Sequence, residues 1–123
     1  MSSPEVSSSP QPSLLVACLC AQWCATCREY QTTFQQIEAR FEALHFVWID
    51  IEDEAELVDP VDVVDFPTLL VARDGRPVFF GPLPPQPETL ARLLQTHVDA
   101  ENDEPALASA ELHGLVARIL ARR

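Results

Sequence analysis

Basic residues are scarce in this chain. Its 123 residues include only 8 that are basic, all of them arginine, against 19 that are acidic, so the formal net charge is −11. Nucleic-acid binding and binding to a membrane surface both rely on clustered cations, and the shortage of cations therefore argues against both kinds of partner. We expect the partners of this chain to be neutral or basic where they contact it.

The sequence also lacks the features of a segment that enters a membrane. No basic residue precedes Arg28, so the apolar run 14–20 has no positively charged stretch before it, as a secretory signal has. The run is also too short to cross a bilayer. We therefore expect a cytoplasmic protein, and in that compartment paired cysteines are more often catalytic or metal-binding than structural.

The apolar content predicts a single domain. With 47% hydrophobic residues, 123 residues suffice for one compact core, whereas two separate cores would each be marginal. Residues 1–13 are rich in Ser and Pro, which predicts a disordered tail. We expect a folded domain over 14–98, followed by 99–123 as a linker and an amphipathic helix that packs on the domain.

The first half of that domain reads as strand, helix and strand. The unbroken apolar run 14–20 is typical of a strand that is buried on both faces. Apolar side chains then recur every three or four residues, which predicts a helix from about Cys24 to Leu44. Residues 46–51 are rich in β-branched and aromatic side chains and predict a second strand. Such a unit places its two strands parallel.

The second half begins with the acidic segment 52–65. Pro60 interrupts this segment, so we expect a short helix on each side of the proline and a solvated face rather than a cation site. The pair Asp74-Gly75 predicts a tight hairpin turn. The remaining elements are predicted as strands over 69–73 and 78–80 and as helices over 87–98 and 106–121.

Two cysteines stand where the first strand gives way to the helix, in the segment Trp23-Cys24-Ala25-Thr26-Cys27. Thiols at this spacing can close a disulfide with each other. We expect Cys24 at the start of the helix, where free backbone N–H groups favour a thiolate. The segment therefore predicts a dithiol redox centre.

Two further cysteines, Cys18 and Cys20, belong to the first strand, where alternation places both on the same face. The interpretation that we favour is core packing, because free cysteine behaves as a small hydrophobe. One alternative is that they supply a second redox partner for Cys27. The other is metal ligation by four thiolates, although the spacing is not a usual zinc spacing.

The order of these elements, with Phe66-Pro67-Thr68 before the hairpin, resembles that of the thioredoxin family over about residues 14–98. The resemblance implies an α/β fold with a mixed central sheet flanked by helices. Relative to the family, the chain is expected to be truncated at its N-terminus and to carry an extra C-terminal helix.

The same resemblance implies a thiol:disulfide oxidoreductase that acts on protein disulfides, needs no organic cofactor and depends on an upstream reductase. It makes Cys24 the attacking thiol and Cys27 the resolving thiol, with Pro67 as a cis-proline facing them. The surface that it implies for substrate binding consists of Trp23, Phe66, Pro67 and Thr68. The alternative is a non-enzymatic module that binds proteins, or a metal through its cysteines. We expect a monomer or a weak dimer.

The chain departs from the family's pattern close to the dithiol. Cys18 stands where the family usually has a buried Asp that helps to move protons at the second thiol, and Trp48 stands at the position of the family's Lys. Thr26 replaces the usual Pro. A thiol cannot act as the same base, so we predict a weaker reductase than a housekeeping thioredoxin.

Overall fold

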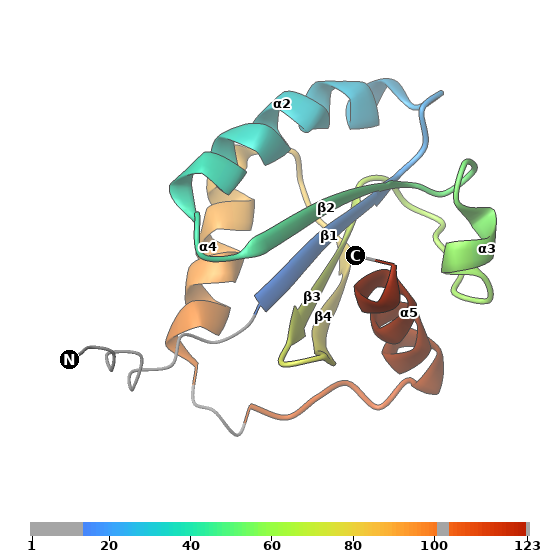
Figure 1. Ribbon diagram of the computed structural model, residues 1–123. Helices are drawn as coiled ribbons and strands as arrows, with labels where there is room; N and C mark the ends of the chain where they lie inside the picture. Colours follow the sequence, from blue (N-terminus) through green and yellow to red (C-terminus); the bar gives the residue numbers. More distant parts are fainter. Residues whose placement is uncertain (1–13, 101–103, 123) are drawn as a thin grey trace.

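The computed structural model describes residues 14–100 and 104–122. The predicted tail at 1–13 lies outside the described residues, as do 101–103 of the predicted linker. A four-stranded sheet in the order β2-β1-β3-β4 forms the centre of the described part, and helices cover both of its faces (Figure 1). This mixed sheet with flanking helices confirms the predicted α/β class.

β1 (Leu14–Cys20) is an inner strand of the sheet. It pairs in parallel with β2 (His45–Asp50), as predicted, and antiparallel with β3 (Thr68–Arg73). All 7 of its residues are buried, in agreement with its unbroken apolar sequence. Its side chains alternate between two apolar clusters: Cys18 faces one side of the sheet and Leu19 the other.

α2 (Ala25–Arg40) begins directly after Cys24, which is its N-cap residue. The prediction extended this helix to Leu44, but the backbone leaves the helical conformation at Phe41, with φ −126° and ψ 63°. Phe41 and Leu44 still pack against the core from the segment that follows. The residues that α2 buries are Cys27, Tyr30, Phe34 and Ile37.

The acidic segment after β2 contains one helix, α3 (Ala55–Val58), which lies before Pro60. The second helix, predicted after that proline, is absent from residues 61–67. Too few residues separate the two prolines for a stable helix, and a following proline disfavours the helical conformation at the residue before Pro67.

β3 and β4 (Arg76–Pro82) form the predicted hairpin. Asp74 and Gly75 take positive φ angles of 51° and 83°, which is the backbone that an Asp-Gly turn favours. Because the turn has only these two residues, pairing begins at once between Arg73 and Arg76. β4 is therefore longer than the predicted strand 78–80.

α4 (Pro87–Asp99) begins at its proline, as predicted, because a proline at the first helical position lacks only an N–H group that would be unpaired anyway. α5 (Ala110–Ala121) begins later than predicted. Residues 106–109 are not helical, and there the Leu107 N–H donates to the Pro77 carbonyl at 2.8 Å. Ser109 then caps the helix by accepting the N–H of Leu112 at 3.2 Å.

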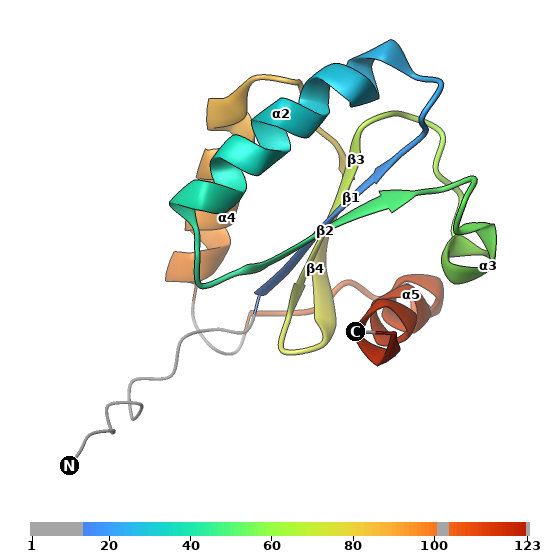
Figure 2. The same cartoon turned by 45° about the horizontal axis from the view of Figure 1, so that its top comes forward.

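Figures 1 and 2 show how the helices divide between the two faces of the sheet. α2 and α4 cover the face that carries Cys18 and Cys20. α3 and α5 cover the opposite face. The side chains that α5 buries there are Leu112, Leu115, Val116 and Ile119. None of the helices in the described ranges has the length and apolar content needed to span a membrane.

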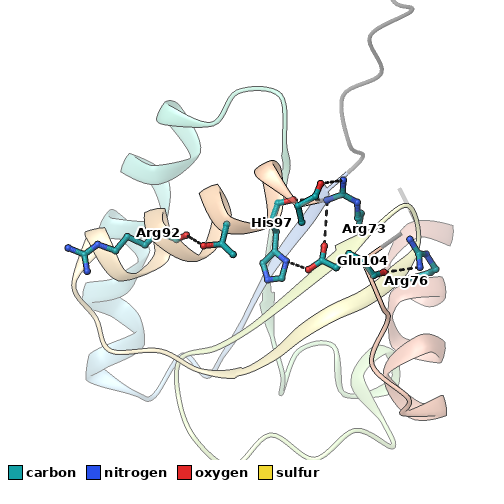
Figure 3. Close-up of polar contacts among 7 residues, drawn as sticks. Arg73, Arg76, Arg92, His97 and Glu104 are labelled. Atoms are coloured by element: carbon teal, nitrogen blue, oxygen red, sulfur yellow. Dashed lines mark hydrogen bonds and ion pairs between the residues drawn. The ribbon is translucent and has the colours of Figure 1, made fainter. Parts of the chain in front are cut away.

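A polar cluster around the buried Arg73 links the end of α4, Glu104 and the β3–β4 hairpin (Figure 3). Arg73, only 1% exposed at the end of β3, donates to the carbonyls of His97 at 2.6 Å and of Ala100 at 3.0 Å. One oxygen of Glu104 lies 3.5 Å from the Arg73 guanidinium, and the other lies 2.5 Å from His97 Nδ1. Arg76 donates to the Glu104 carbonyl at 3.2 Å. The cluster ties the end of α4 and the segment leading to α5 to the β3–β4 hairpin.

Candidate functional site

The predicted dithiol lies at the junction between β1 and α2. Cys24 is half-buried at the N-cap of α2, where its carbonyl accepts the N–H of Arg28 at 3.1 Å. The Arg28 side chain folds back and donates to the Gln22 carbonyl at 2.9 Å, which holds the loop before the helix. Cys27 lies in the first turn of α2, one turn beyond Cys24, and is only 1% exposed. A partly accessible thiol is thus followed, one turn later, by a sulfur in the interior.

The partner of Cys27 differs from the predicted one. A disulfide joins Cys27 to Cys20, with their Cα atoms 5.7 Å apart, while Cys18 and Cys24 carry free thiols. Cys20 is the last residue of β1 and faces the side of the sheet that α2 covers, so it meets the buried side of the first turn. Cys20 is therefore bonded to Cys27 and does not stand in the core as a free thiol.

Cys18 fits the core-packing interpretation. It is fully buried, and its Sγ lies 3.9 Å from that of Cys20. Burial raises the pKa of the Cys18 thiol well above its usual value, so the group keeps its proton at neutral pH. The pKa of the neighbouring Tyr30 hydroxyl is also raised, mainly by burial and then by Cys18. The position at which the family carries a buried acid therefore holds a neutral group here.

The raised pKa of Cys18 predicts a loss of stability at alkaline pH. Above about pH 9.0, its ordinary value, the thiol ionises in the unfolded chain but stays protonated in the folded one. The unfolded state then binds fewer protons, so the free energy of unfolding should fall by up to about 1.4 kcal/mol per pH unit through this group. Urea unfolding of the oxidised protein between neutral pH and about pH 10 measures this slope. The Cys18→Ala variant should show a shallower slope; identical slopes in the wild type and Cys18→Ala would contradict the prediction.

Trp23 and Phe66, which are distant in sequence, lie together beside Cys24. Trp23 is 61% exposed, and its ring meets that of Phe66 edge to face, with centroids 5.5 Å apart. The Trp23 indole N–H donates to the Glu52 carboxylate at 2.7 Å, a contact that the sequence analysis missed. Cys24 and Phe66 both pack against the same core cluster. An exposed aromatic surface therefore borders the free thiol.

The Phe66-Pro67-Thr68 segment leads into β3. The Phe66–Pro67 peptide bond is cis, and Pro67 is buried. The Thr68 side chain is also buried, and its hydroxyl donates to the Asp65 carbonyl at 2.5 Å. Thr68 can therefore take part in a docking surface through its backbone and not through its side chain.

A pocket of about 240 Å³ opens beside Cys27, with Arg28 and Trp48 among its lining residues. Asp50 and Asp53 line its acidic side. Asp50 is held in place because its carboxylate accepts the N–H groups of Glu52 at 2.9 Å and of Asp53 at 3.0 Å. The acidic pattern of 52–65 predicted only a solvated face. Because parallel strands end at one edge of a sheet, the position of this segment directly after β2 was a signal that it borders the dithiol.

The metal-binding alternative required the four cysteines to converge on one ion. Two of them, Cys20 and Cys27, are instead bonded to each other. In residues 14–100 and 104–122, no group of three or more His, Cys, Asp or Glu side chains is arranged to hold a metal ion.

Comparisons with known proteins agree with this geometry. The family model "Thioredoxin" matches residues 4–96. The thioredoxin of Listeria monocytogenes is 37% identical over 59 residues, which cover 47% of this chain and 57% of that protein. Thioredoxin H2-1 of Oryza sativa is 31% identical over 65 residues, which cover 53% of this chain and 47% of that protein. The chain thus spans about half the length of the curated relatives that it matches.

Solved structures show the same fold. The crystal structure of thioredoxin from Trypanosoma brucei brucei superposes with a TM-score of 0.64 at 24% identity, over 81% of this chain and 89% of that one. The crystal structure of a thioredoxin from Nicotiana alata also gives a TM-score of 0.64, at 22% identity, over 76% of this chain and 81% of that one. With the family model matching most of its length, this chain belongs to the thioredoxin family.

Proposed function

We propose that this protein is a thiol:disulfide oxidoreductase that reduces disulfides in other proteins through Cys24 and Cys27. One observation carries the proposal. The free Cys24 thiol lies partly accessible at the N-cap of α2, one turn from Cys27, a sulfur that is itself able to form a disulfide. The thiolate of an accessible cysteine is the form that attacks disulfides.

The reaction begins from the fully reduced chain. The Cys24 thiolate attacks one sulfur of the substrate disulfide, and the other substrate sulfur leaves as a thiolate. The Cys27 thiolate then attacks the Cys24 sulfur and displaces the second substrate thiol. Two electrons pass from the dithiol to the substrate, and a Cys24–Cys27 disulfide remains. A separate reductase must return this disulfide to the dithiol before another turnover.

The residues around Cys24 indicate the kind of substrate. Trp23 and Phe66, next to the cis peptide bond at Pro67, offer a surface on which an extended peptide can lie, while Glu52 adds negative charge beside Trp23. The whole chain carries a net charge of −11. We therefore expect protein disulfides whose neighbouring residues are neutral or basic.

The proposal also covers compartment and assembly. A dithiol reductase works where other thiols are kept reduced, and the free thiols of Cys18 and Cys24 suit the cytoplasm. The apolar face of α5 packs against the sheet. Leu120 is the one large apolar side chain of this helix that is exposed. These features favour a monomer or a weak dimer.

A trapping experiment tests the roles of the two thiols. The Cys27→Ser variant can attack a disulfide through Cys24 but lacks the resolving thiol, so it should accumulate as a mixed disulfide with insulin chains. Non-reducing electrophoresis followed by mass analysis detects the adduct. The double variant Cys24→Ser/Cys27→Ser is the matched control and should form none. An equal yield of adduct from both variants would show that Cys24 is not the attacking thiol.

A further inference from the structure

The first turn of α2 places Cys27 between two sulfurs. Cys24 lies one turn before it on the accessible side, and Cys20 is bonded to it from the end of β1. Cys20 and Cys27 are each only 1% exposed, whereas Cys24 is half-buried. The two candidate disulfides of Cys27 therefore differ in their surroundings: one would lie at the surface, and the other lies inside the core.

We propose that Cys20 is a third redox-active cysteine. It replaces Cys24 as the disulfide partner of Cys27, so that the disulfide moves from the surface into the core. The proposal rests on the proposed function, because substrate reduction by Cys24 and Cys27 is what supplies the first disulfide. Cys20 would then be a catalytic residue in its own right, since its sulfur bonds to a reacting atom.

The transfer is a thiol–disulfide exchange within one chain. The Cys20 thiolate attacks Sγ of Cys27, the Cys20–Cys27 bond forms, and the Cys24–Cys27 bond breaks. The electron pair of the broken bond leaves with Cys24, which becomes a thiolate and can take a proton from water, while the proton of Cys20 is released. The chain is neither oxidised nor reduced overall, so no further reactant is needed.

The geometry favours Cys20 over Cys18 for this step. Cys18 faces the same side of the sheet but lies further down β1, away from the start of α2. Its sulfur lies 3.9 Å from that of Cys20 and is free. Cys18→Ala is thus a matched control. It removes one thiol from the same strand and the same face of the sheet, but it keeps the sulfur that is bonded to Cys27.

The transfer leaves Cys24 as a free thiol in the oxidised chain. Such a chain still has a nucleophile at its surface but no longer has a resolving thiol, because Cys27 is held by Cys20. It should therefore form stable mixed disulfides at Cys24 with a second disulfide compound. The oxidised protein changes from a dithiol reductase into a protein that is modified at a single thiol.

Peptide mapping distinguishes the two disulfides, because the sequence offers cleavage sites at Trp23 and Arg28. The reduced wild-type protein is reacted with excess insulin, quenched with acid, alkylated with N-ethylmaleimide, and cut with chymotrypsin and trypsin. A Cys20–Cys27 bond links the fragment that ends at Trp23 to the fragment that begins at Cys24. A Cys24–Cys27 bond stays within one fragment. We expect the linked pair, with Cys24 either alkylated or joined to an insulin peptide; the internal disulfide with Cys20 alkylated would overturn the proposal.

The Cys24→Ala variant separates this proposal from the proposed function. It keeps three of the chain's four cysteines. After oxidation with diamide and unfolding in urea it should bind one maleimide, at Cys18, where the reduced variant binds three. Cys18→Ala should give the same linked fragments as the wild type. If oxidised Cys24→Ala still binds three maleimides while the wild type reduces insulin, Cys20 is not redox-active but the proposed function stands. If Cys24→Ala binds one maleimide but the wild type does not reduce insulin, the proposed function fails and the Cys20–Cys27 couple remains.

Discussion

Replacing Cys24 by serine should abolish the reduction of insulin disulfides by this protein. A serine hydroxyl does not attack a disulfide, and removal of a nucleophile costs on the order of 10³-fold or more in rate. The measurement is insulin turbidity with dithiothreitol as the electron donor, read against a blank without protein. The wild-type rate itself should lie below that of a housekeeping thioredoxin, because Cys18 replaces the buried acid and stays protonated.

The Cys18→Ala variant is the control for this experiment. Cys18→Ala also removes one thiol, but one that is buried and remote from solvent, so a loss of rate specific to Cys24→Ser identifies the nucleophile. Circular dichroism should show both variants folded, since Cys24 is only half-buried. An insulin reduction rate for Cys24→Ser equal to that of the wild type would place the nucleophile elsewhere.

Replacing the buried Arg73 by methionine should greatly lower the free energy of unfolding. The guanidinium is 1% exposed, donates to two carbonyls at the end of α4 and is paired with Glu104. Removing one partner of a buried ion pair costs about 3–5 kcal/mol, because the other group is left without compensation. A domain of this kind has roughly 5–15 kcal/mol in total, so Arg73→Met should lose a large share of the free energy of unfolding.

The neighbouring Arg76 provides the matched control for Arg73. It belongs to the same hairpin and forms one hydrogen bond to the Glu104 carbonyl at 3.2 Å, but it is only half-buried. Arg76→Met should therefore cost about 1 kcal/mol. Urea unfolding of the oxidised proteins, followed by fluorescence, compares the two variants. Equal losses would show that the Arg73 cluster does not fix the end of α4.

Much of the fold could be predicted because several of its elements are determined by the residues within them. The apolar run of β1, the Asp-Gly turn and Pro87 at the start of α4 each determine their own backbone, and each is found where the sequence predicts it. The start of α5 could not be predicted in this way, because the N–H of Leu107 is held by the Pro77 carbonyl of another element. The apolar pattern does not reveal such a contact.

The candidate site also has features that follow from the local sequence and features that depend on packing. The spacing of Cys24 and Cys27 identified both thiols, and alternation along β1 placed Cys20 on the correct face. Which sulfur meets Cys27 depends on how α2 crosses the end of β1, which is a matter of packing. The contact between Trp23 and Glu52 likewise joins two loops that become neighbours only when the sheet forms.

The placement of α5 affects the order in which the chain can fold. One face of the sheet is covered by α2 and α4, which are both complete by residue 99. The other face stays largely bare until Leu112, Leu115, Val116 and Ile119 arrive from the C-terminal part of the chain. During synthesis on the ribosome, the domain therefore exposes an apolar surface until its last helix emerges, and a nascent chain that stalls before this point is a natural client for chaperones.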